Sequence, residues 1–299
     1  MIVLVIKEKL MVTYKEFYQG YQADYFAYRG YSLRKELERA ESDKSEPFEI
    51  YDYSSLDSIR SIKMEIRLNY FLAIETVFEL MFALRPIDGV QQDQYILENI
   101  TRRKDHYKEI REMASGTLPT FLNETVPLND GRHIPFIRYL FYGGLNGDTS
   151  PLNRIDQSIA TIKTILAIVA GDLSDRLEFN SYKHGIRCFR FGTNFSLHDH
   201  KTQEQILSFD ISDSMAFYEA IESDNSISVV TKVFDSARDI AMTLYCNNLI
   251  SNMIMIRRGM LDPKKKVTIV FFDELDFYNQ SRPNVKIQNL KLSVKKIFS

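Results

Sequence analysis

The segment from Phe179 to Arg187 gathers several kinds of polar side chain beside a glycine. It carries an amide, an ammonium group, an imidazole and a guanidinium, on Asn180, Lys183, His184 and Arg187. A neutral imidazole exchanges protons near pH 7, an amide can hold it in one orientation, and cations can neutralise a phosphate. The segment therefore predicts a phosphate or RNA site in which His184 is the general acid/base and Asn180 orients it or the phosphate.

The same residues also fit the end of a helix. Gly185 can adopt the left-handed conformation that ends a helix, while Lys183 and His184 complement the negative end of the helix dipole. If a helix reaches this point, Asn180 and His184 lie one turn apart on the same face. The sequence supports both interpretations, the polar site and the helix cap.

Two carboxylates, Glu75 and Glu79, are four residues apart in a stretch that is otherwise apolar. On a helix this spacing stacks them on one face. A carboxylate in apolar surroundings is costly unless it meets a cation or a hydrogen-bond donor. We expect either a group that orients the imidazole of His184, or a polar tether to Lys or Arg, or simple exposure to solvent.

Metal or cofactor chemistry has little support. His198 and His200 flank Asp199, but two histidines do not make a zinc site, so an ordinary polar loop is expected there. The phosphate-loop, dinucleotide, zinc-protease and esterase motifs do not occur in the sequence. We predict no metal and no cofactor; a metal-dependent enzyme that uses Glu75, Glu79 and His184 is the least favoured class.

The apolar residues recur with helical spacing over most of the chain. Five helices are expected. A Tyr-rich helix over about 12–42 is split near Gly30, a central, buried helix covers about 56–84, and a highly charged helix covers about 90–114. A fourth helix starts at Ser150-Pro151 and covers about 152–179, and the last covers about 232–258. Alternating apolar residues predict a β-hairpin over about 186–212, and shorter strands at 227–230 and 267–272. The prediction is a mainly α protein, a bundle of four to five long helices with a small inserted β-hairpin.

This pattern also suggests how the chain is divided. Residues 1–55 form a Tyr-rich helical segment and a linker, residues 56–265 form the bundle, and residues 266–299 form a short strand and a basic, loosely ordered tail. Met11 is an alternative start, which would make the first ten residues dispensable.

Composition limits the classes of function. The net charge of -2 provides no global field that attracts nucleic acid, so any contact with it must be local. Two cysteines are too few for a disulfide framework and fit a reducing cytoplasm. No uncharged stretch approaches the roughly 20 apolar residues of a membrane helix. We predict a cytoplasmic protein without a membrane partner.

Two further clusters each allow two interpretations. Six tyrosines between Tyr14 and Tyr31 follow one helical stripe, which favours packing against the body over a surface for stacking bases. The basic run from Thr101 to His106 is typical of a solvated face, with contact to phosphate as the alternative.

Asn180-Ser181-Tyr182-Lys183-His184 resembles the second half of the signature of the HEPN superfamily. These proteins are compact helical bundles, many of them metal-independent ribonucleases of defence and toxin–antitoxin systems. Their signature is an Arg, often followed by Asn, and a His that is separated from the Arg by four to six intervening residues. Here Phe179 occupies the Arg position, and neither Arg176 nor Arg187 has the family's spacing. Arg102 and His106 give a second partial match with a shorter spacing.

The resemblance implies a homodimeric protein that binds or cleaves RNA in stress or phage defence. It assigns His184 and Asn180 to catalysis and Lys183, Arg187 and Arg176 to the phosphate. Because Phe179 replaces the family's Arg, the alternative is a non-catalytic interaction module with the same kind of bundle.

Overall fold

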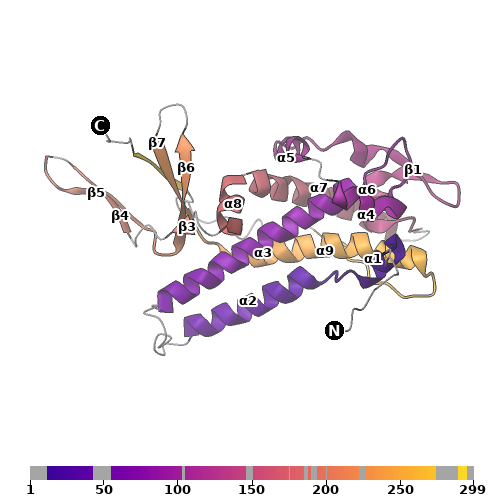
Figure 1. Ribbon diagram of the computed structural model, residues 1–299, viewed down its shortest axis with the longest axis horizontal. Helices are drawn as coiled ribbons and strands as arrows, with labels where there is room; N and C mark the ends of the chain where they lie inside the picture. Colours follow the sequence, from indigo (N-terminus) through magenta and orange to yellow (C-terminus); the bar gives the residue numbers. More distant parts are fainter. Residues whose placement is uncertain are drawn as a thin grey trace, which may run out of the picture. The chain divides into compact units, whose positions relative to one another are not determined.

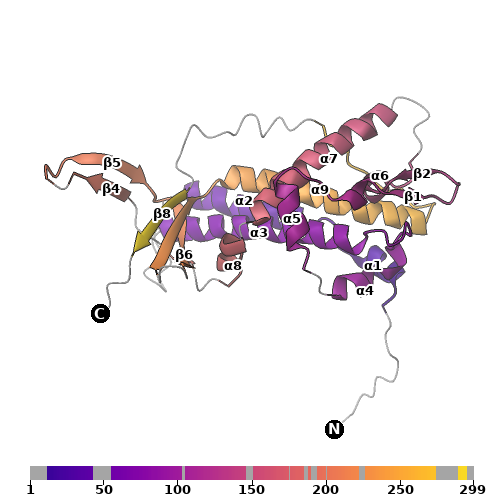
Figure 2. The ribbon, with the colours of Figure 1, turned by 90° about the horizontal axis from the view of Figure 1, so that it is seen from above.

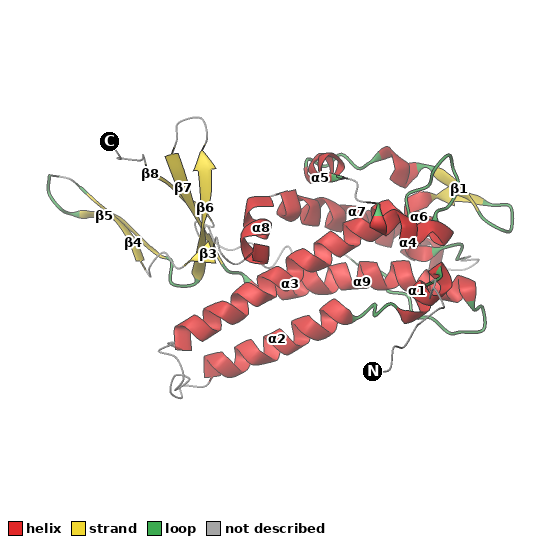
Figure 3. Cartoon of the chain, in the orientation of Figure 1, coloured by secondary structure: helices red, strands yellow, loops and turns green. Residues whose placement is uncertain are grey.

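Helices make up most of the described chain (Figure 3). The computed structural model describes residues 12–42, 55–102, 105–145, 151–174, 176–184, 188–189, 194–199, 201–221, 226–273 and 289–294. The chain forms two compact units, and three of the five boundaries between them fall inside the long helices α3 (Ser55–Ala83), α7 (Pro151–Ser174) and α9 (Ser236–Leu261). Each unit is therefore assembled from three separate stretches of sequence. The path of the chain can be followed in Figures 1 and 2.

The first unit contains Met1–Tyr25, Glu75–Gly171 and Cys246–Glu274. Besides its parts of α3, α7 and α9, it holds short helices and one small antiparallel sheet: α1 (Tyr14–Gly20), η1 (Asp93–Tyr95), α4 (Ile96–Thr101), α5 (Tyr107–Ala114), η2 (Thr120–Asn123), β1 (Thr125–Pro127), β2 (His133–Pro135) and α6 (Phe136–Tyr142). Its core includes a run of aromatic rings, from Phe82 through Phe121 to Phe136, with centroids 5.8 and 6.0 Å apart. Edge-tilted aromatic contacts of this kind bury large apolar areas.

Gly143 ends α6 at a point where no other residue fits. Its φ of 58° lies in the left-handed region, and a Cβ built on it would lie 2.9 Å from atoms of Ile256 and Met260. Both the backbone conformation and the close approach of α9 therefore require glycine.

The second unit contains Phe26–Ile74, Asp172–Tyr245 and Leu275–Ser299. It holds the remaining parts of α3, α7 and α9 together with α2 (Tyr25–Ser42), α8 (Arg176–His184), β3 (Cys188–Phe189), β4 (Asn194–His198), β5 (Gln205–Asp210), β6 (Ser214–Ile221), β7 (Ser226–Val233) and β8 (Asn289–Val294). The strands form a four-stranded antiparallel sheet in the order β3-β6-β7-β8, and β4 pairs separately with β5.

The mainly α prediction is confirmed. The helices α3, α7 and α9 cover most of three predicted ranges, but residues 176–179 of the range 152–179 begin α8, and Lys232 and Val233 of the range 232–258 end β7. The N-terminal helical region breaks at residues 21–24 rather than at Gly30, which lies inside α2 and is buried. The single helix expected over 90–114 is three separate pieces, η1, α4 and α5. Of the tyrosine stripe, Tyr18 is buried, whereas Tyr28 and Tyr31 are exposed.

The strand predictions were less accurate. Residues 267–272 are not a strand: the backbone of Val270 is satisfied by the side-chain amide of Asn252 instead of by a neighbouring strand. The long strand β6 was not anticipated at all. The C-terminal segment, expected to be loosely ordered, contributes β8 to the edge of the sheet. In the part of the chain that the structure describes, no helix is long and apolar enough to cross a bilayer.

Candidate functional site

The polar segment that the sequence singled out is part of helix α8, which continues to His184. Its inner positions are buried, namely Glu178, Phe179, Ser181 and Tyr182. Lys183 and His184 are exposed and Asn180 is half-buried. Because the helix persists to His184, Asn180 and His184 lie one turn apart, as the polar-site interpretation requires.

The inner face of α8 packs on Phe71 of α3. The ring of Phe71 lies 5.4 Å from that of Phe179 and 6.2 Å from that of Tyr182, between centroids. Burial raises the pKa of Tyr182 well above its ordinary value, so the phenol stays neutral. Phe179, which stands at the Arg position of the HEPN signature, is therefore a core residue.

A cation nevertheless lies near that position. The Nζ of Lys183 is 5.1 Å from the centre of the Phe179 ring, a distance typical of a cation–π contact. Lys183 follows Phe179 by one helical turn, so its ammonium group covers the side chain that replaces the Arg. Asn180, Lys183 and His184 therefore all lie near the C-terminal end of α8, where Lys183 and His184 are exposed.

Other predicted site residues are less informative. Arg187 and the side chain of Arg176 lie outside what the structure describes. Glu75 is half-buried and Glu79 is exposed. The pKa of Tyr21 is raised mainly by burial and, to a smaller extent, by the negative charge of Glu79. Their proposed link to His184 stays a prediction.

The hairpin tip behaves as a polar loop. The carboxylate of Asp199 accepts hydrogen bonds from the backbone N–H groups of Lys201 and Thr202, at 2.7 and 2.8 Å. These bonds lower the pKa of Asp199. Among the described residues, no three His, Cys, Asp or Glu side chains are grouped as metal ligands.

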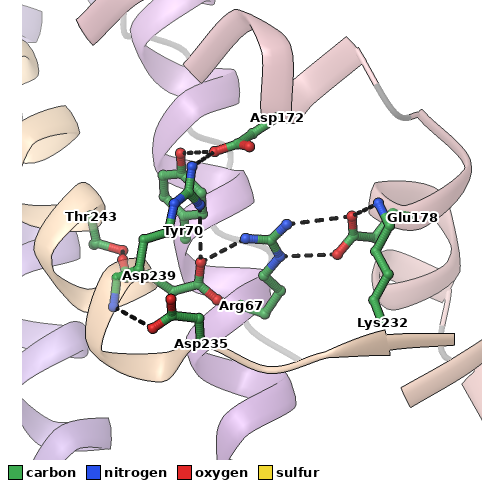
Figure 4. A network of polar contacts seen from close by, with 9 residues as sticks. Arg67, Tyr70, Asp172, Glu178, Lys232, Asp235, Asp239 and Thr243 are labelled. Carbon is green, nitrogen blue, oxygen red and sulfur yellow. Dashed lines mark hydrogen bonds and ion pairs between the residues drawn. The ribbon is translucent and has the colours of Figure 1, made fainter. Parts of the chain in front are cut away.

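The most extensive polar feature of the second unit is a network of buried charges centred on Arg67 of α3 (Figure 4). Arg67 donates from Nε and Nη2 to the two carboxylate oxygens of Glu178 on α8, at 3.0 and 3.4 Å. Lys232 of β7 binds the same carboxylate. The side chain of Glu178 is only 2% exposed, so these two cations compensate a carboxylate that solvent hardly reaches.

The network continues from Arg67 into α9 and α7. Nη1 of Arg67 lies 2.6 Å from Oδ1 of Asp239, and Arg238 bridges from Asp239 to Asp172, at 3.7 and 2.7 Å. The hydroxyl of Tyr70 also donates to Asp172. Figure 4 shows these side chains converging from α3, α7, α8, α9 and β7.

The ion pairs of this network join three cations, Arg67, Lys232 and Arg238, to the carboxylates of Asp172, Glu178 and Asp239. The carboxylate of Asp235 accepts a hydrogen bond from the backbone N–H of Arg238. Burial raises the pKa of Asp239 to about 6, although Arg67 and Arg238 favour the charged form. Burial, and then the charge of Glu178, raise the pKa of the Cys188 thiol to about 11. Glu178 and Asp239 are almost inaccessible and already accept hydrogen bonds, so they hold elements together rather than meeting a ligand.

Sequence reasoning missed this network, although a signal was present. Arg67 lies between Ile66 and Tyr70, two residues of the apolar stripe of α3. A charged residue inside a buried stripe indicates a buried partner. Glu178 directly precedes Phe179 and was a candidate for that partner.

Comparisons of the chain with protein-family models, curated proteins and solved structures gave no significant match.

Proposed function

We propose that the protein binds RNA at the exposed end of α8, and that His184 is the general acid/base of any cleavage there. The observation that carries the proposal is the position of the Lys183 ammonium group, 5.1 Å from the Phe179 ring. It supplies a positive charge beside Asn180 and His184, although the chain lacks the Arg of the resembled signature. A cation, an amide and an imidazole within five residues of one helix are suited to a phosphodiester.

A second candidate is a non-catalytic interaction module. The burial of Phe179 favours it, because a core aromatic ring has replaced the side chain that binds the scissile phosphate in the resembled family. In this case Lys183 and His184, both in the last turn of α8, interact favourably with the negative end of the helix dipole.

The first experiment measures binding of a single-stranded RNA oligonucleotide by fluorescence anisotropy across a salt series. We expect binding at low salt that weakens steeply as salt rises. Lys183→Ala should weaken it and reduce the slope of log K against log salt by about 0.7, the value for one phosphate contact on a single strand. Lys108→Ala is the matched control, because its side chain is exposed on α5 of the other unit.

The second experiment separates catalysis from capping. If His184 is the acid/base, His184→Ala should abolish cleavage of the RNA, a loss of about 10² to 10⁴ in rate, with little change in the thermal midpoint. If His184 only stabilises the end of the helix, His184→Ala should lower the thermal midpoint and leave any cleavage unchanged. Wild-type protein that neither binds nor cuts RNA at low salt would leave only the interaction module.

A further inference from the structure

Arg67 supports α8 in two ways, directly through Glu178 and indirectly through Phe71 of its own helix α3. It donates two hydrogen bonds to Glu178, and its guanidinium lies 4.6 Å from the centre of Phe71, the ring on which Phe179 and Tyr182 pack. One side chain of α3 therefore supports both the polar and the aromatic anchor of α8.

Helix α8 depends on such support because it has only nine residues. Helices of this length are marginal on their own, so contacts with the rest of the fold hold them in place. Ser181, also on the inner face, is fully buried, and its hydroxyl has no hydrogen-bond partner among the described residues. The polar anchoring of this face thus rests on Glu178, which binds Arg67 and Lys232.

We propose that Arg67 is a positioning residue for the RNA-binding end of α8. It fixes the inner face through Glu178 and Phe71, and thereby sets where Asn180, Lys183 and His184 stand relative to a phosphate. This inference rests on the proposed function, but it concerns a buried residue that does not itself meet the RNA.

Arg60 provides a matched control on the same helix. It is also a buried arginine, two turns before Arg67, but its guanidinium donates to Asp57 and to the Ser212 carbonyl. Loss of Arg60 removes a buried cation from α3 without removing the contact with Glu178.

The test compares Arg67→Gln with Arg60→Gln in RNA binding, at a temperature where circular dichroism shows both variants folded. We expect Arg67→Gln to weaken binding about tenfold and Arg60→Gln to change it less than about twofold. The salt slope of Arg67→Gln should equal that of the wild type, because a positioning residue makes no phosphate contact. Unchanged affinity, or a slope reduced as in Lys183→Ala, would overturn the positioning role.

Glu178→Gln offers a second route, since it keeps the shape of the side chain and removes its charge. It should weaken binding at least as much as Arg67→Gln does, because Glu178 also binds Lys232, and the double variant should bind less weakly than the sum of the two single losses predicts, because both changes break the contact between Arg67 and Glu178. Additive losses would contradict the proposal.

A measurement without RNA separates this inference from the proposed function. The ring C–H resonances of His184, assigned with His184→Ala, should shift in Arg67→Gln and stay unchanged in Arg60→Gln. If the wild-type protein does not bind RNA but these shifts occur, the proposed function is refuted and the positioning role of Arg67 is not. Unshifted His184 resonances in Arg67→Gln refute the positioning role whether or not RNA binds.

Discussion

Each unit contains an arginine at the centre of a polar cluster, and the two arginines are stabilised by different kinds of partner. Arg67, in the second unit, binds carboxylates from α8 and α9. Arg257, in the first unit, donates mainly to backbone carbonyls, those of Leu140 at 3.1 Å and Met253 at 2.8 Å, and pairs with one carboxylate, Asp93.

The difference predicts how each cluster responds to mutation and pH. Backbone carbonyls do not titrate, and the phenols near Arg257 stay neutral because burial raises the pKa of Tyr18 and Tyr139. The partners of Arg67 are acids that also bind other cations, Lys232 and Arg238. In the Arg67 network each carboxylate that binds Arg67 has a second cation, so the loss of one cation is partly compensated, but the network responds to pH. The Arg257 cluster does not respond to pH near neutrality, but among the described residues it has no second cation that could replace Arg257.

The largest effect is expected for Arg257→Met. It leaves the Asp93 carboxylate with the Tyr139 hydroxyl but without its cation and removes a donor to the Leu140 carbonyl, and breaking a buried pair in this way costs about 3 to 5 kcal/mol. Urea denaturation followed by circular dichroism measures the free energy of unfolding. A loss below about 1 kcal/mol would show that the cluster is no more than a packing contact.

The pH response of Asp239 comes next. Its folded pKa of about 6 exceeds the ordinary value of 3.8, so the folded protein keeps a proton that the unfolded chain releases between these values. The contribution of this group to stability is complete below about pH 4 and is lost as the pH rises through 6. Relative to Asp239→Asn, the wild type should lose about 2 to 3 kcal/mol between pH 4 and 7.

Tyr139→Phe is the control for this titration. Because burial holds the pKa of Tyr139 above its ordinary value, the phenol stays neutral over this range, and the difference from the wild type should not change with pH. A constant difference for Asp239→Asn would contradict the contrast between the clusters.

Arg67→Met should cost less than Arg257→Met, about 2 kcal/mol. Glu178 keeps Lys232 and Asp239 keeps Arg238, so neither carboxylate is left without a cation. Combining the change with Lys232→Met should cost more than the sum of the two single changes, because Glu178 then loses both cations. Strict additivity would argue against redundancy.

The smallest effect is expected for Arg34→Ala on α2. Arg34 pairs with Glu38 at 2.8 Å, but both side chains are largely exposed, and water screens such pairs. The free energy of unfolding should not change measurably. A clear loss of unfolding free energy would mean that the geometry of an ion pair, rather than its burial, decides how strongly an arginine stabilises the fold.

Much of the helical fold was predictable because long amphipathic stripes leave a strong periodic signal. Ile59 to Leu84 marked α3, and Ser150-Pro151 marked the start of α7. The strands left weaker signals. β6 has buried residues at consecutive positions, Met215, Ala216 and Phe217, so it lacks the alternation of a strand with one solvated face. β8 pairs with β7 from more than fifty residues away, and no local pattern reveals such a pairing.

The candidate site was predictable only in part. The sequence identified the outer face of α8, Asn180 and His184, because amide and imidazole one turn apart form a local pattern. It did not identify the inner face, since the contact of Glu178 with Arg67 joins residues separated by 111 positions. Charges buried by the tertiary fold look like solvated ones until their partners are known.

The contacts of Arg258 have a consequence for synthesis on the ribosome. Helix α1 has a capping box at its start, formed by Thr13 and Glu16, but only seven residues, too few to persist alone. The guanidinium of Arg258 binds the carbonyls of Tyr18, Gln19 and Tyr21 at its other end.

The residue that completes α1 is therefore translated about 240 positions after it. Until Arg258 has left the exit tunnel, the nascent N-terminal segment has no partner for these carbonyls and stays open to chaperones and proteases.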